Sequence, residues 1–124
     1  MRWIVDAMNV IGARPDGWWR DRHAAMETLV GELEAWAGAE GSDVTVVFEQ
    51  PPRPPIDSAI VTVAHAPAAA PDSADDEIVR MVRADDHPHD IVVVTSDRTL
   101  ADRVRSAGAD VLAPRRFRTL LAGR

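Results

Sequence analysis

Five acidic residues stand where a parallel sheet would place a functional site. Three of them follow short apolar runs and two begin a predicted helix: Asp6, Glu49, Asp97, Asp75 and Asp76. Because parallel sheets bind ligands outside the carboxyl ends of their strands, we expect these carboxylates to converge at one edge. Asp43 and Asp90 precede strands instead, and are expected at the opposite edge as solvated turn residues.

Converging carboxylates need a cation, because like charges within about 4–6 Å oppose ionisation. All 14 basic residues of the chain are arginine, so no lysine is available to compensate. Oxygen ligands suit Mg²⁺ or Mn²⁺. Such an ion lowers the pKa of its water and offsets negative charge on a phosphodiester under attack. Metal-assisted hydrolysis is therefore the leading reaction class.

Most of these acids also have a purely structural explanation. Asp97 fits the N-cap of a following helix. Asp75 and Asp76 would be stabilised by the helix dipole, and Glu49 fits a solvated position before a proline-rich loop. Asp6 is the exception, since it follows a buried run and a carboxylate there without a partner would carry a large desolvation cost.

Composition limits the remaining chemistry. The 124 residues are 46% hydrophobic, which predicts one compact domain spanning residues 1–124. The absence of cysteine excludes disulfides, thiolate nucleophiles and cysteine-based metal sites. The absence of lysine excludes Walker-A nucleotide binding and Schiff-base catalysis. No targeting signal or membrane-length apolar run is apparent, so we expect a cytoplasmic protein without a membrane partner.

Apolar runs and helical periodicity alternate along the chain. Short valine-rich runs at residues 2–5, 44–48 and 91–94 predict strands buried on both faces. Residues 59–64 predict a strand of alternating or fully buried type, and residues 110–113 predict a short strand. Apolar residues at spacings of three and four predict helices at residues 21–37, 73–85, 100–108 and 114–121. This order predicts an α/β fold, a three-layer α/β/α sandwich around a mostly parallel sheet.

Glycine, proline and serine mark the predicted ends of these elements. Gly38 and Gly41 are expected to end the first long helix. Four prolines in residues 50–55 exclude helix and central strand, which predicts an exposed loop. Residues 65–71 are alanine and proline after His65, which predicts a linker. Ser73 is expected to be the N-cap of the next helix.

Four segments together resemble the YacP-like branch of the NYN-domain family, within the PIN-like nuclease superfamily. The segments are residues 5–12, 46–49, 73–78 and 94–98, and they stand in the family's order at the ends of the predicted strands. The resemblance covers nearly the whole chain. It implies a PIN-like α/β/α fold and divalent-metal-dependent ribonuclease activity, with acidic residues as metal ligands.

The resemblance also assigns roles to individual residues. It implies that Asp6 is the first-strand ligand and that Asn9 orients it or contacts the metal's water. Asp76 would be the mid-chain acid with Asp75 beside it, and Asp97 the acid after the fourth strand. Glu49 completes the expected metal set, while Thr95 and Ser96 would hold the loop that carries Asp97.

Two positions depart from the family's pattern. Met8 stands where the family commonly has an aromatic residue. Glu49 stands where aspartate is frequent, which keeps the charge and lengthens its reach by one methylene. Neither change removes the expected metal cluster.

The formal net charge of −6 points away from nucleic acid, because phosphate contacts dominate such binding. The arginines, however, gather beside Trp18 and Trp19 and near the C-terminal helix. Arginine suits phosphate, and exposed tryptophan stacks on unpaired bases. The residues expected to contact substrate are therefore Arg14, His65, Ser96, Arg98, Arg115 and Arg116. The sequence is also compatible with tryptophans that only pack against the core and with C-terminal arginines that only lie in solvent at a helix end.

The sequence thus favours an endoribonuclease that uses Mg²⁺ or Mn²⁺ on messenger, transfer or ribosome-associated RNA. A non-catalytic RNA- or ribosome-binding module with the same fold is the first alternative. A receiver-type signalling domain is the second, although its phosphoryl site normally uses a lysine that this chain lacks. A monomer and a homodimer both fit the sequence.

Overall fold

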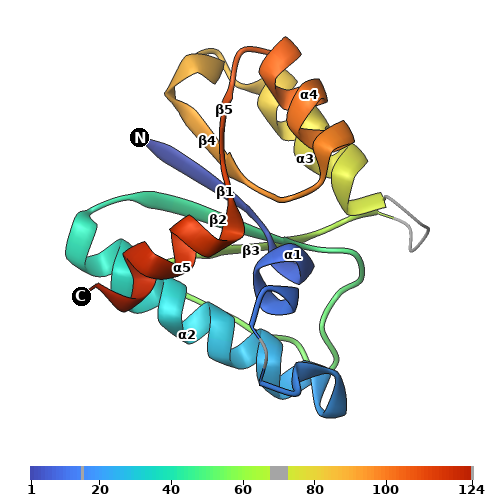
Figure 1. Cartoon of the computed structure of the whole chain (residues 1–124), viewed down its shortest axis with the longest axis vertical. Helices are drawn as coiled ribbons and strands as arrows, with labels where there is room; N and C mark the ends of the chain where they lie inside the picture. Colours follow the sequence, from blue (N-terminus) through green and yellow to red (C-terminus); the bar gives the residue numbers. More distant parts are fainter. Residues whose placement is uncertain (15, 68–72, 124) are drawn as a thin grey trace.

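One parallel sheet organises the chain. The computed structural model describes residues 1–14, 16–67 and 73–123. Five strands lie in the order β3-β2-β1-β4-β5, all parallel (Figure 1). They are β1 Arg2–Asp6, β2 Asp43–Phe48, β3 Thr62–His65, β4 Ile91–Val94 and β5 Asp110–Leu112. The predicted α/β fold is confirmed, and β1 lies at the centre between β2 and β4.

Helices cover both faces of this sheet (Figure 1). One face packs against α1 Ala7–Gly12, α2 Arg22–Glu40 and α5 Pro114–Ala122, and the other against α3 Ser73–Ala84 and α4 Arg98–Ser106. Alternate strand residues separate the two cores, since Val5 packs with the first group and Ile4 with the second. Trp3, Trp36 and Phe117 pack together in the first core, with ring centroids 5.1–5.7 Å apart, and Trp36 meets the other two rings edge to face. None of the described helices has the length and apolarity needed to cross a bilayer.

The short helix α1 was not predicted from the sequence. It begins directly after Asp6, which occupies its N-cap position with an extended backbone. Its six residues bury Ala7, Val10 and Ile11 against α2, α5 and the sheet. A helix of this length spans less than two turns, so its apolar period is too short to recognise in the sequence. The short 3₁₀ helices Trp18–Arg20 and Pro88–Asp90 were missed for the same reason.

Several predicted boundaries were wrong. The helix predicted at residues 100–108 is α4, which begins and ends two residues earlier, at Arg98 and Ser106. The helix α2 does not end at Gly38 but continues to Glu40, and Trp36 and Ala37 are still buried. Gly41, the second glycine predicted to end this helix, is its C-cap, with a left-handed φ of 67°. The strand β3 begins at Thr62 rather than at residue 59, since the Ser58 hydroxyl accepts hydrogen bonds from the backbone N–H groups of residues 60 and 61. Ser73 lies inside α3 rather than at its N-cap.

The two predicted loops have different outcomes. Residues 50–55 form neither helix nor strand, as their prolines predicted. The predicted linker 65–71 begins at His65, which is the last residue of β3, and residues 68–72 lie outside the described part of the chain.

Gly38 and Gly41 provide a matched test of how α2 ends. A Cβ added at Gly38 would meet no atom within 4 Å, so Gly38→Ala should raise the free energy of unfolding by about 0.5–1 kcal/mol. Gly41→Ala should lower it by about 1–2 kcal/mol, because its left-handed backbone disfavours a side chain. Urea denaturation of both variants checks the expectation. A loss of stability in Gly38→Ala would show that α2 ends earlier.

Candidate active site

Asp6 lies at the centre of the carboxyl edge of the sheet. It ends β1, and only 4% of its surface is exposed. Its Oδ2 accepts hydrogen bonds from Asn9 Nδ2 at 2.6 Å and from Thr95 Oγ1 at 2.9 Å. The pKa of this carboxyl is raised to about 7, chiefly by burial and to a smaller extent by the charges of Asp75, Asp97 and Glu49, while the Thr95 hydrogen bond lowers it. Four carboxylates therefore interact at this edge.

Neutral side chains tie Asp6 to the loop that follows β4. Asn9 Oδ1 accepts hydrogen bonds from the backbone N–H of Ser96, at 3.1 Å, and from the Ser96 hydroxyl. Thr95 Oγ1 accepts one from the backbone N–H of Asp97, also at 3.1 Å. Asn9, which was expected to orient Asp6, thus contacts both Asp6 and Ser96, and Thr95 and Ser96, which were expected to hold this loop, make hydrogen bonds within it and to the site. Together they place Asp97 beside Asp6.

Helix N-termini supply partial positive charge to the same edge. Asp97 is the N-cap of α4, and its Oδ1 accepts a hydrogen bond from the backbone N–H of Leu100 at 3.0 Å. Asp75 lies in the first turn of α3. The unpaired backbone N–H groups of a helix N-terminus stabilise nearby anions. Asp97 and Asp75 can therefore stabilise the N-termini of their helices and also belong to the group of interacting carboxylates.

Asp75 and Asp76 exchange the places expected for them. Asp76 Oδ1 accepts a hydrogen bond from Arg103 Nη1 at 2.9 Å, and its side chain is 72% exposed. Asp75 contributes to the raised pKa of Asp6. The acid that joins Asp6 from α3 is therefore Asp75, whereas Asp76 links α3 to α4.

Two residues expected to contact substrate are engaged elsewhere. Arg14 Nη2 lies 2.7 Å from Glu32 Oε2, and Arg14 Nε lies 3.4 Å from Asp16 Oδ2. His65 Nδ1 lies 2.8 Å from the carbonyl oxygen of Ala66. The pKa of Glu77 is lowered mainly by its hydrogen bond from Arg80 and to a smaller extent by His65, which places His65 beside α3.

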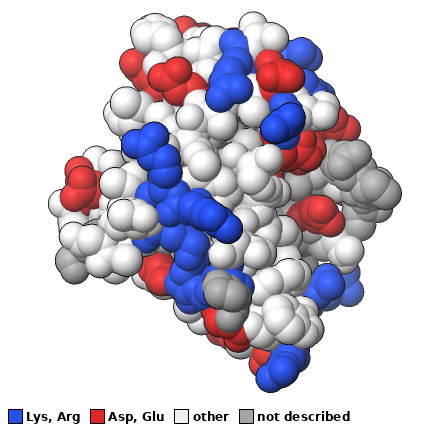
Figure 2. Space-filling model, in the orientation of Figure 1, with Lys and Arg blue, Asp and Glu red and all other residues white. Residues whose placement is uncertain are grey.

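The other expected arginines are available. Arg98, Arg115 and Arg116 form no ion pair with any described residue. Figure 2 shows arginine side chains gathered over α5, the helix that carries Arg115 and Arg116. Trp18, in contrast, packs against the first core and lies under Arg22, whereas Trp19 is 58% exposed.

Two hollows flank Met8 beside the acids. The first, of about 540 Å³, is lined by Asn9, Ser96 and Arg115 among others. The second, of about 340 Å³, lies between α1, α2 and the loop after β2, and Glu49 lines it. Sequence reasoning assigned no role to the second hollow. Its only signal is that the proline-rich loop directly follows Glu49.

The donors at this edge match a hard cation in their chemistry. They are carboxylate oxygens together with an amide and hydroxyls, and sulfur is absent from the set. Across residues 1–14, 16–67 and 73–123, no three histidine or acidic side chains lie close enough together to hold one ion. Direct coordination by one or two carboxylates, with water completing the shell, is the usual mode of Mg²⁺ and fits this spacing.

A sequence profile of the YacP-like NYN domain matches residues 3–123. The chain belongs to this family. Its NYN domain is a PIN-like, nuclease-type domain of a kind associated with nucleic acids.

Two crystal structures of Rae1 (YacP) from Bacillus subtilis share the fold of this NYN domain. Each has a TM-score of 0.84 and is 22% identical to the chain. The match to the structure without the mutation covers 99% of this chain and 74% of the Rae1 chain. The match to the W164L mutant covers 98% of this chain and 75% of the Rae1 chain. No curated protein matches the chain.

The raised pKa of Asp6 predicts how the stability of the NYN domain depends on pH. An unfolded Asp6 loses its proton near 3.8, the ordinary pKa of aspartate, whereas the folded one keeps it to about 7. The free energy of unfolding should therefore fall as pH rises from about 4 to about 7, by on the order of 4 kcal/mol from this group. Asp6→Asn should remove that fall and be the more stable protein at pH 8.

Urea denaturation of both proteins across this pH range, in EDTA, measures the difference. The difference between wild type and Asp6→Asn removes the contributions of the other titrating groups, which both proteins share. Asp43→Asn, at the exposed start of β2, serves as the control. Parallel pH profiles for wild type and Asp6→Asn would contradict the raised pKa of Asp6.

Proposed function

We propose that this NYN domain is a divalent-metal-dependent endoribonuclease that hydrolyses RNA phosphodiester bonds. The observation that carries the proposal is the buried Asp6 carboxylate, which interacts with Asp75, Asp97 and Glu49 at the carboxyl edge of the sheet. A fold needs no such cluster, since mutual repulsion destabilises it in the absence of a cation. A site that accumulates carboxylates at this cost is typical of metal-assisted catalysis.

Asp6 and Asp97 are the residues that would bind Mg²⁺ or Mn²⁺ directly, with Glu49 and Asp75 acting through water. Thr95 and Asn9 both donate to Asp6 Oδ2, so Oδ1 is the oxygen left for a cation. Asp97 uses Oδ1 for the helix cap, which leaves Oδ2. When bound, the ion would lower the pKa of a water molecule and offset the charge that develops on the phosphate.

The chain's own residues would hold the RNA and orient the acids. Asn9 and Thr95 fix the Asp6 carboxylate, and Ser96 joins Asn9 to the loop after β4. Arg98 and Arg115 lie at this edge without acidic partners among the described residues and would bind phosphates. Arg116 would extend that contact along α5. The substrate would be messenger, transfer or ribosome-associated RNA in the cytoplasm.

A second candidate function is an RNA- or ribosome-binding module without catalysis. It is favoured by the spacing of the acids, since among the described residues no three acidic or histidine side chains lie close enough together to hold one metal ion. The two functions differ in one measurable outcome. The binding module holds RNA without cutting it, whatever cation is present.

Replacing Asp97 tests catalysis without loss of its helix cap. Asparagine caps helices about as well as aspartate, so Asp97→Asn should fold normally and lose only the charge. With Mg²⁺ or Mn²⁺, wild type should cleave single-stranded RNA, and Asp97→Asn should be slower by more than about 100-fold. Asp43→Asn, at the opposite edge, should cleave as wild type does. Wild-type binding of RNA without cleavage in either cation would establish the binding module instead.

The neighbouring acids of α3 form a matched pair. Asp75→Asn should weaken cleavage by at least about 10-fold, because Asp75 belongs to the interacting carboxylates. Asp76→Asn should leave the rate unchanged and lower stability by less than about 1 kcal/mol, because it loses only an exposed ion pair with Arg103. The measurements are cleavage rates and urea denaturation. The reverse order of rates would return the mid-chain role to Asp76.

A further inference from the structure

The second hollow beside Met8 has an apolar floor and a polar rim. Its floor is formed by side chains from α1, α2, the end of β2 and the following loop: Met8, Met26, Phe48 and Pro52. Its rim carries Arg22, His23, Glu49, Gln50 and Arg53. Its volume of about 340 Å³ falls in the range of small-ligand sites. We call it the Met8 hollow.

The Met8 hollow adjoins the candidate active site. Glu49 lines its rim and also acts on the pKa of Asp6. Met8 lies two positions from Asp6 and directly before Asn9, which donates to the Asp6 carboxylate. A ligand that fills this hollow would therefore lie beside Glu49, one of the four interacting carboxylates.

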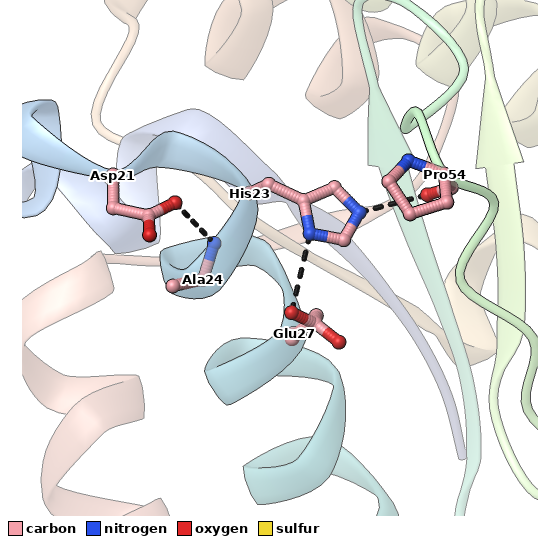
Figure 3. A network of polar contacts seen from close by, with 5 residues as sticks. All are labelled: Asp21, His23, Ala24, Glu27 and Pro54. Atoms are coloured by element: carbon pink, nitrogen blue, oxygen red, sulfur yellow. Dashed lines mark hydrogen bonds and ion pairs between the residues drawn. The ribbon is translucent and has the colours of Figure 1, made fainter.

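Hydrogen bonds hold the wall of the hollow in place (Figure 3). His23 Nε2 lies 2.7 Å from the carbonyl oxygen of Pro54, and Nδ1 lies 3.2 Å from Glu27 Oε1. Asp21 caps the same end of α2 by accepting a hydrogen bond from the backbone N–H of Ala24 at 3.0 Å. The His23 ring thus joins the proline-rich loop to the first turns of α2. The wall of the hollow is therefore preformed, since these hydrogen bonds lie within the protein.

We propose that the Met8 hollow binds one base of a single-stranded RNA, the base next to the phosphodiester bond that is cleaved. This inference rests on the proposed function and adds a substrate contact to it. Methionine sulfur makes favourable contacts with aromatic rings, which suits Met8 and Met26 to the face of a base. The Gln50 amide and the Arg53 guanidinium can donate hydrogen bonds to its edge.

The charge of the rim favours RNA over an apolar protein segment. Arg22 lies 5.6 Å over the Trp18 ring, and neither it nor Arg53 forms an ion pair with a carboxylate in the described chain. Two cations without acidic partners match a ligand that carries phosphates.

The two hollows together define a path for the strand. Met8 separates them, with Arg115 and Ser96 in the first and Arg53 and Gln50 in the second. A strand that crosses Met8 would pass Asn9, which lines the first hollow and donates a hydrogen bond to Asp6. A base that enters the Met8 hollow cannot be paired, so the path excludes duplex RNA.

The four methionines of the chain provide a direct probe. Protein labelled with ¹³C at the methionine methyl groups is titrated in EDTA with a short oligouridine, and each signal is assigned by a Met→Leu variant. Ring currents from a bound base should shift the signals of Met8 and Met26. Met81, on α3 and away from both hollows, should not move. The same length of abasic sugar-phosphate strand should bind and leave all of these signals unshifted.

Affinity gives an independent readout. By fluorescence anisotropy, Met8→Ala should weaken oligouridine binding by about five-fold or more and leave binding of the abasic strand unchanged. Met81→Ala is the matched control and should bind both as wild type does. Because these measurements need no cleavage, they remain informative if the catalytic proposal fails.

Each contrary result has a distinct meaning. Oligouridine binding without shifts at Met8 and Met26 would overturn the base site and leave the proposed function intact. Equal shifts with the abasic strand would also overturn it. Shifts that depend on protein concentration alone would assign the hollow to a second copy of the chain. An absence of RNA binding would overturn both the base site and the proposed function.

Discussion

The burial of one carboxylate, Asp6, at the end of the central strand is the constraint on which the rest of the site depends. Its pKa is raised to about 7 chiefly by that burial, with three acidic neighbours adding to the effect. The protein offsets the negative charge at this edge without lysine. Neutral donors from Asn9 and Thr95 hold one oxygen, and the N-termini of α3 and α4 bring partial positive charge to the same edge. A divalent cation would complete this compensation, which links the stability of the sheet edge to its proposed chemistry.

The arrangement of the sheet could be predicted because its signals are local and strong. Valine-rich runs mark buried parallel strands, and acids that follow such runs must meet at the carboxyl edge. The errors arose where short-range interactions decide the structure. The Ser58 hydroxyl accepts hydrogen bonds from two backbone N–H groups, so β3 begins later in the chain than predicted. The helix α1 is too short to show a helical period of apolar residues. Neither feature has a distinctive sequence pattern.

The details of the site depend on partners from distant elements, which a sequence does not reveal. Adjacent residues of a helix point about 100° apart, so of Asp75 and Asp76 only one can face Asp6. The choice is made by Arg103 on α4, which binds Asp76. In the same way Glu32 on α2 engages Arg14, which sequence reasoning had assigned to substrate. Composition shows which charges exist, and packing decides which of them are already neutralised.

The pairing of β1 with β4 has a consequence for how the protein folds. Asp6 and Thr95 are 89 residues apart, and the hydrogen bond between them forms only once that long loop has closed. Contacts of such separation form slowly, because the entropy of the loop is lost before they are made. A chain still emerging during synthesis, or a fragment lacking β4, holds Asp6 without Thr95 or Asp97. The arrangement of acids around Asp6 therefore arises together with the native state and is absent from its precursors.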